Sequence, residues 1–158
     1  MKIISHRGNL TGPNKSRENS PDYIEEAMTN GYDVEVDLRM KGVDLYLGHD
    51  EPQYSITKSW ITDRKKMLWV HTKDKESLLY MVHEIPDAQF FYHERERYTI
   101  VSNGLVWAHD FSLKLTDKCI VPTLSLDEIE KYNGRGVYAL CTDYVAECER
   151  KFIGAKYD

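Results

Sequence analysis

The chain has 158 residues, a length that suits one globular domain spanning residues 1–158. Its formal net charge is −5, which argues against a nucleic-acid partner because neutralising phosphates needs clustered lysine and arginine. No apolar run approaches the roughly 20 residues that cross a bilayer, so no integral membrane segment is expected. Three cysteines without C-x-x-C spacing, and an N-terminal apolar stretch too short for a signal peptide, favour a cytoplasmic protein.

Short apolar runs that end in polar residues recur along the chain. Eight of them are rich in β-branched, aromatic or leucine side chains, which is typical of strands. The predicted strands are residues 2–6, 33–39, 67–72, 89–93, 98–102, 105–108, 119–123 and 137–142.

Helical patterns separate several of these strands. Ser20 is a suitable N-cap for a first helix, and Gly31 is a suitable stop. Residues 75–85 carry apolar side chains at helical spacing, and Ser125 with Glu128 forms a capping box before a short helix. The alternation of strand and helix predicts an α/β protein with a parallel sheet.

Eight such strands suggest a closed barrel, but the chain is short for one. A (β/α)8 barrel needs at least ~200 residues, and the intervals at 94–97 and 103–104 are too short for any helix. We therefore predict a minimal or distorted (β/α)8 barrel of the TIM type with several helices missing, irregular along residues 90–111. Residues 53–64 are expected to form only a modest loop.

Polar side chains gather where the predicted strands end. Glu35 and Asp37 share one face of the second strand, because side chains two residues apart point the same way. Taken alone, that pair is more simply the wet face of an amphipathic strand. However, the carboxyl ends of parallel barrel strands all face one site, and other strands end in the same manner. The residues concerned are His6, Arg7, Glu35, Asp37, His49, Asp50, His71 and Lys73.

These segments, in this order, resemble a known enzyme family. The runs His6-Arg7-Gly8, Glu18-Asn19, Glu35-Val36-Asp37 and His49-Asp50 are similar to the motifs of the glycerophosphodiester phosphodiesterases, which belong to the phosphatidylinositol-phospholipase-C-like barrel superfamily. The run Thr142-Asp143-Tyr144 is similar to the end of that family's last strand. Between residues 50 and 137 only the strand order and His71-Thr72-Lys73 correspond.

The resemblance implies metal-dependent hydrolysis of a small, glycerophosphodiester-like substrate. His6 and His49 would divide the general acid and base roles, since imidazole titrates near neutral pH. Arg7 and Lys73 would contact the phosphate. The crowded carboxylates would bind one divalent cation, Mg²⁺ or Ca²⁺, with Mn²⁺ as the alternative. The expected metal ligands are Glu35, Asp37 and Glu18.

The third strand departs from the family pattern. Where the family usually has Glu-x-Lys, this chain has His71-Thr72-Lys73. His71 is either a nitrogen ligand, which would shift the preference toward Mn²⁺ or Zn²⁺, or a phosphate contact. Four residues are expected to support the site, although each also has a plain structural interpretation: Asn19, Asp50, His93 and Asp143. His109 is expected to be structural, and His83 to be solvated on a helix.

Several alternatives stay open from the sequence. The attacking group is either water or a neighbouring substrate hydroxyl, and the latter would give a cyclic phosphate. Lipid cleavage of the phospholipase-D type ranks lower, because the chain has no apolar insertion for membranes. The rival from another class is a non-catalytic module that binds phosphate or a sugar phosphate on a degraded barrel. The short chain and His71 favour that rival. The presence of both histidines and of Glu35 and Asp37 argues against it.

Overall fold

The computed structural model describes residues 1–110, 112, 114–132 and 136–154. Within them the protein is an α/β structure with ten strands in one mixed, mostly parallel sheet and five helices. The strands are β1 (Lys2–His6), β2 (Asp33–Lys41), β3 (Asp44–Leu47), β4 (Tyr54–Ile56), β5 (Leu68–Thr72), β6 (Gln89–Tyr92), β7 (Tyr98–Ile100), β8 (Val106–Ala108), β9 (Cys119–Thr123) and β10 (Ala139–Thr142). The helices are α1 (Pro21–Thr29), α2 (Lys58–Arg64), α3 (Lys75–Glu84), α4 (Leu126–Lys131) and α5 (Val145–Phe152).

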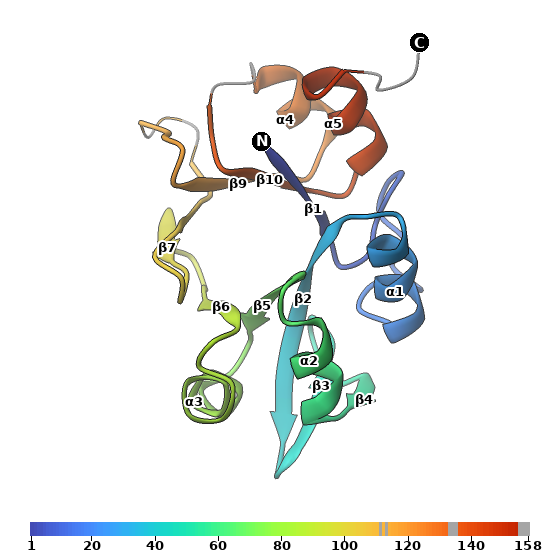
Figure 1. Ribbon diagram of the computed structural model, residues 1–158, viewed down its shortest axis with the longest axis vertical. Helices are drawn as coiled ribbons and strands as arrows, with labels where there is room; N and C mark the ends of the chain where they lie inside the picture. The colour runs from blue at the N-terminus through green and yellow to red at the C-terminus, as the bar shows by residue number, and fades with distance from the viewer. Residues whose placement is uncertain (111, 113, 133–135, 155–158) are drawn as a thin grey trace.

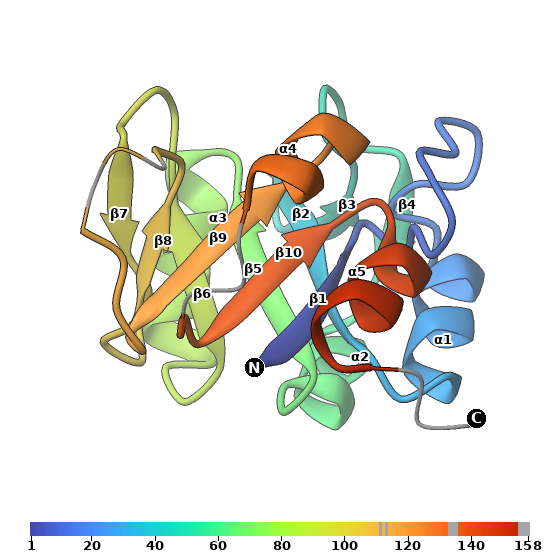
Figure 2. The same cartoon turned by 90° about the horizontal axis from the view of Figure 1, so that it is seen from above.

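The strands follow one another around a common centre, and the helices lie on their outer side (Figure 1). Parallel pairing runs in the order β6-β5-β2-β1-β10-β9-β8, and β7 pairs antiparallel with β8. Figure 2 shows β1, β10 and β9 side by side, pointing the same way, with α4 and α5 on their outer face. Because these strands are parallel, their carboxyl ends come together at one end of the sheet.

Strand β2 is long because it has neighbours along its whole length. Its first residues pair with β1 on one edge, its last residues pair antiparallel with β3 on that same edge, and β5 covers the other edge. Strand β4 extends the β3 hairpin.

The sheet does not close through strand pairing among the described residues. Strands β6 and β7 form no ladder, but hydrogen bonds bridge the gap between them. The Ser102 amide donates to the Phe90 carbonyl (2.8 Å), and the Thr99 hydroxyl donates to the Tyr92 carbonyl (3.0 Å). The Ser102 hydroxyl also donates to the Ala88 carbonyl (2.8 Å). These hydrogen bonds satisfy backbone carbonyls in and next to β6 that would otherwise lack a partner, because no strand within the described residues pairs with this edge.

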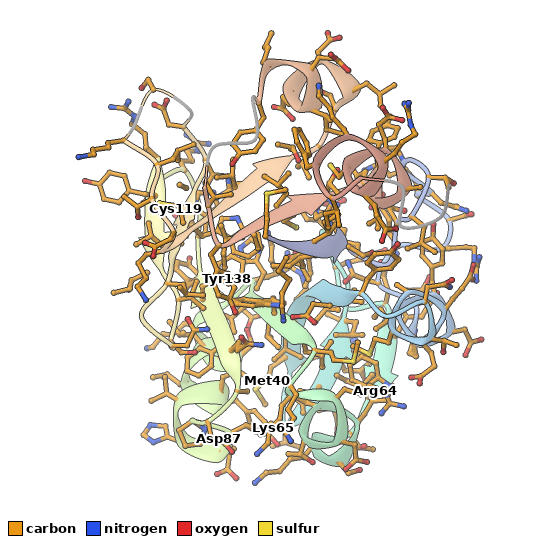
Figure 3. All side chains as sticks on the ribbon, turned by 45° about the horizontal axis from the view of Figure 1, so that its top comes forward. Met40, Arg64, Lys65, Asp87, Cys119 and Tyr138 are labelled. Atoms are coloured by element: carbon orange, nitrogen blue, oxygen red, sulfur yellow. The ribbon has the colours of Figure 1, made fainter. Side chains whose placement is uncertain are left out.

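Large apolar side chains from several strands form one buried cluster. Trp69, Phe91 and Trp107 lie in this interior cluster, each at most 3% exposed. Tyr138, labelled in Figure 3, packs edge-on against Trp69 with ring centroids 6.0 Å apart. Two further clusters pack the helices on the outer faces of the sheet, so both sides of the parallel strands are covered.

The α/β class and all eight predicted strands are confirmed, with ends that differ by up to two residues. The prediction of a loop at residues 53–64 was wrong, because β4 and α2 occupy most of this segment. Helix α2 has only seven residues, too few for a periodic pattern to stand out, and it begins where the Thr57 side chain accepts from the Trp60 amide (3.1 Å). No helix lies between β6 and β8. Among the helices described, none has the length and apolar character needed to span a membrane.

The hairpin that carries residues 48–50 depends on one glycine. A Cβ at Gly48 would overlap the carbonyl oxygen of Glu51, whereas a Cβ at Gly42, also at positive φ, would meet nothing within 4 Å. We expect Gly42→Ala to cost about 1–2 kcal/mol of unfolding free energy, the usual cost of a left-handed non-glycine residue. Gly48→Ala should cost clearly more unfolding free energy, because the backbone at Glu51 must move to make room for the added Cβ. Urea unfolding of both variants measures this, and equal losses would contradict it.

Candidate functional site

A cavity of about 230 Å³ opens at the carboxyl ends of the parallel strands. It is lined by residues from β1, β2, β5, β6, β8, β9 and β10 and by residues that follow β1, β3, β5, β6, β8 and β9. Seven residues expected from the sequence lie in its wall: His6, Arg7, Glu35, His49, His71, Lys73 and His93. Asp37 contacts Arg7, and Asp143 contacts His6, so both carboxylates pack against residues of this wall. The topology therefore brings most of the predicted site residues to one place.

The backbone around Arg7 is held in an unusual conformation. Arg7 (φ 56°) and Asn19 (φ 63°) are both left-handed without being glycine. The Arg7 amide donates to the Glu35 carbonyl (2.9 Å), and the Asn19 amide donates to the Arg7 carbonyl (3.1 Å). Such conformations persist only where the surrounding structure fixes them, and they concentrate at functional sites.

Glu35, Asp37 and His71 form a buried group that could hold a metal ion. Alternation along β2 puts both carboxylates on one side, and the register of β5 sets His71 beside Asp37. His71 Nδ1 lies 3.6 Å from Glu35 Oε1 and 3.4 Å from Asp37 Oδ1. One candidate ligand atom from each residue lies within 4.8 Å of the others.

The hydrogen bonds of this group leave room for a cation. His71 Nε2 lies 3.1 Å from the His93 carbonyl, which can only accept, so Nε2 carries a hydrogen. If the His71 ring is neutral, its Nδ1 lone pair points toward two carboxylates, and these groups repel one another. A proton on Nδ1 or a cation between the three groups removes this repulsion. Glu35 Oε2 and Asp37 Oδ1 are buried and accept no hydrogen bond.

Asp37 is nevertheless ionised. Burial alone would raise the pKa of its carboxyl, but the charges of Arg7 and His71 and a hydrogen bond from Asn19 hold that pKa below its usual range. Arg7 Nε lies 2.8 Å from Asp37 Oδ2, and Asn19 Nδ2 donates to the same oxygen (2.8 Å). Lys73 Nζ lies 3.8 Å from Oδ1. Asp37 thus orients both cationic side chains at the cavity.

His6 is fixed by a carboxylate on its inner side. Its Nδ1 lies 2.7 Å from Asp143 Oδ1, and its Nε2 lies 3.8 Å from Glu35 Oε2. Burial alone would lower the pKa of His6, but the hydrogen bond to Asp143 and the charge on Glu35 outweigh it and raise the pKa. An Nδ1–H bound to Asp143 leaves Nε2 as the nitrogen that faces the cavity.

Asn9 joins Asp143 to Glu18, and no sequence pattern indicated this connection. Its buried side-chain amide donates to Asp143 Oδ1 (2.7 Å) and Glu18 Oε1 (3.0 Å), and its oxygen accepts from the Asn14 amide (3.0 Å). Glu18 also accepts from Arg7 Nη1 (3.1 Å). The group that could hold a metal does not include Glu18, which is occupied in positioning Arg7.

His49 stands at the mouth of the cavity with a side chain 42% exposed. Its Nδ1 lies 2.7 Å from Asp50 Oδ1. The loop is anchored because the Gly48 amide donates to the Asp37 carbonyl (3.0 Å) and Arg39 donates to the carbonyls of Gly48 and His49. His49 and the metal-capable group are therefore tied together through Asp37.

His109, which was expected to be structural, also lies in the cavity wall. Its ring stacks on His93 with centroids 3.8 Å apart and planes at 13°. The sequence carried a signal, since both histidines follow strands, but the adjacency of the ends of β6 and β8 could not be inferred from it. His83 is exposed on α3, as expected, and all three cysteines are free.

Comparison of the chain with family models, characterised proteins and solved structures finds no match. The functional interpretation therefore depends on the site geometry and on the motif resemblance.

We expect Asp143→Asn to lower the pKa of His6, because it removes the ionised hydrogen-bond partner that raises this pKa. The raised pKa of His6 in the folded state stabilises the protein fully at pH values below about 6.5, the pKa of histidine in the unfolded chain. This stabilisation is lost as the pH rises through the pKa of the folded state. The variant should therefore lose more unfolding free energy, about 1–3 kcal/mol, near pH 5.5 than near pH 9. Imidazole NMR titration and urea unfolding at both pH values measure this. An unchanged His6 pKa would contradict the pairing.

Proposed function

We propose that this protein is a metal-dependent phosphodiesterase acting on a small, glycerophosphodiester-like substrate. The observation that carries the proposal is the position of His71 Nδ1 against Glu35 and Asp37, in one cavity with two cationic and four further imidazole side chains. We further propose that the fold is a reduced (β/α)8 barrel whose ladder is interrupted between β6 and β7. The carboxyl-end position of the cavity is the place where such barrels carry their active sites.

The donor set fits one divalent cation. The two carboxylates, with their unpartnered buried oxygens, suit Mg²⁺, and the imidazole nitrogen shifts the preference toward Mn²⁺. When bound, such a cation supplies positive charge to phosphate oxygens. Glu35, Asp37 and His71 would hold it, and Glu18 would not take part.

Arg7 and Lys73 would bind the phosphate. Both line the cavity, and both are oriented by Asp37. Glu18 is the second carboxylate that pairs with Arg7, and it restricts the Arg7 guanidinium further. A guanidinium fixed before binding loses less side-chain entropy when the anion arrives, which strengthens its contact with a phosphate oxygen.

His6 and His49 would move the protons of the reaction. His6 presents Nε2 to the cavity, while Asp143 holds its other nitrogen in place. His49 lies at the exposed mouth, where a leaving alcohol can depart and a water can enter. Two imidazoles on one cavity can serve as general acid and general base near neutral pH.

Metal binding should depend on Glu35 and not on Glu18. We expect Glu35→Gln to weaken Mg²⁺ and Mn²⁺ binding by about 100-fold or more, beyond the 10- to 100-fold typical of losing an outer-shell partner. Glu18→Gln should stay within about tenfold of the parent, because Glu18 contacts Arg7 and Asn9 instead. Calorimetric titration of both variants tests this. The ligand assignment fails if Glu18→Gln loses binding and Glu35→Gln keeps it.

Turnover should depend on both site histidines. Replacing His6 with Asn or His49 with Ala should each slow diester hydrolysis by roughly 10²- to 10⁴-fold, the usual contribution of a general acid or base. His83→Ala, on the exposed face of α3, is the matched control and should be near neutral. The assay uses glycerophosphodiesters with Mg²⁺, Ca²⁺ and Mn²⁺.

Two results would contradict the proposal. Parental rates in both histidine variants would exclude this pair as acid and base. Phosphate binding without turnover of any diester, with any of the three metals, would instead identify the non-catalytic binding module.

A further inference from the structure

One wall of the cavity consists of flat rings that stack on one another. Trp107 and Phe91 have centroids 4.3 Å apart with planes at 22°, and Phe91 stacks on His71 at 4.8 Å and 16°. His93 and His109 form a second, closer stack at 3.8 Å and 13°. All five rings line the same cavity.

The remaining lining differs sharply in chemistry. Arg7, Lys73 and Glu35 bring charge to the same space of about 230 Å³. A cavity of this size takes one small ligand, so a molecule that reaches the cations also meets the rings. Such a ligand must combine an anionic group with an uncharged surface.

The stack formed by His93 and His109 is the accessible one. Phe91 and Trp107 are almost fully buried, but the His93 side chain is 13% exposed and His109 is exposed. Loss of solvation within the stack and the charge of the neighbouring His93 together lower the pKa of His109 to about 4. Near neutral pH the His109 ring is therefore a flat π surface without charge.

We propose that His93 and His109, which line the cavity together with Phe91 and Trp107, form a stacking platform for a planar ring carried by one alcohol of the phosphodiester. This inference rests on the proposed function, because it places the phosphate at Arg7 and Lys73. Planar rings gain from stacking on flat neutral rings, and a saturated ring of the same size presents no such face. The substrate class is thus a phosphodiester with an aryl or nucleobase-bearing alcohol.

Two matched pairs of monoester ligands test the platform without relying on turnover. Benzyl phosphate and cyclohexylmethyl phosphate carry the same charge and differ in the flatness of the ring. Adenosine 5′-monophosphate and ribose 5-phosphate differ in the presence of the base. Dissociation constants are measured by calorimetry with and without Mg²⁺. We expect the flat member of at least one pair to bind roughly tenfold tighter, the size of one ring-stacking contact.

The pair that shows the preference identifies the source of the ring. A preference for benzyl phosphate indicates an aryl alcohol, and a preference confined to the adenosine pair indicates a nucleoside. Both results support the platform. Equal affinities within both pairs overturn it.

Variants at His109 assign the preference to the platform. His109→Ala should remove the preference for the flat ligand while leaving the saturated ligand's affinity unchanged. His109→Phe should retain the preference, and His83→Ala should behave like the parent. An unchanged preference in His109→Ala overturns the proposal. A preference that disappears in His109→Ala, in a protein that hydrolyses no diester, would support the platform and contradict only the phosphodiesterase activity.

Discussion

Glu35 and Asp37 place two carboxylates on the same face of β2, and these residues are only 2% and 0% exposed. The need to compensate their buried negative charge is the main constraint on this structure. Buried negative charges are costly unless cations compensate them. Around Asp37 the compensation comes from Arg7 and Lys73, which places both cations at the cavity. Around Glu35 the neighbours are His6 and His71, two imidazoles whose charge depends on a proton. The site is therefore complete only with an added proton or metal.

The same constraint explains the conformation of the first loop. Arg7 can reach Asp37 because the chain after β1 turns through a left-handed residue, and Asn19 returns in the same conformation to bond Asp37. Gly8 makes this turn feasible, since a Cβ there would lie 2.9 Å from the Tyr23 ring. Asn9 then joins this loop to Asp143 at the end of β10, so the groups that hold His6 and Arg7 share one network.

Sequence patterns could predict what depends on local repetition. Alternation gave Glu35 and Asp37 a common face, and apolar runs gave the parallel strands with small errors at their ends. Patterns could not give contacts that depend on distant chain segments. Asn9 is a single polar residue in a loop, and its importance comes from Asp143, 134 positions away. His109 could not be placed next to His93 without knowing that the ends of β6 and β8 meet. The role expected for Glu18 rested on family resemblance, whereas the structure pairs this carboxylate with Arg7.

The proposed function depends on a divalent cation bound between Glu35, Asp37 and His71. A crystal structure of the protein grown with Mn²⁺, with anomalous data collected near the manganese edge, tests this site directly. We expect one strong peak within coordination distance of His71 Nδ1 and of an oxygen from each carboxylate. The absence of a peak at this group, with His71 Nδ1 in hydrogen-bond contact with the carboxylates alone, would contradict the proposed metal site.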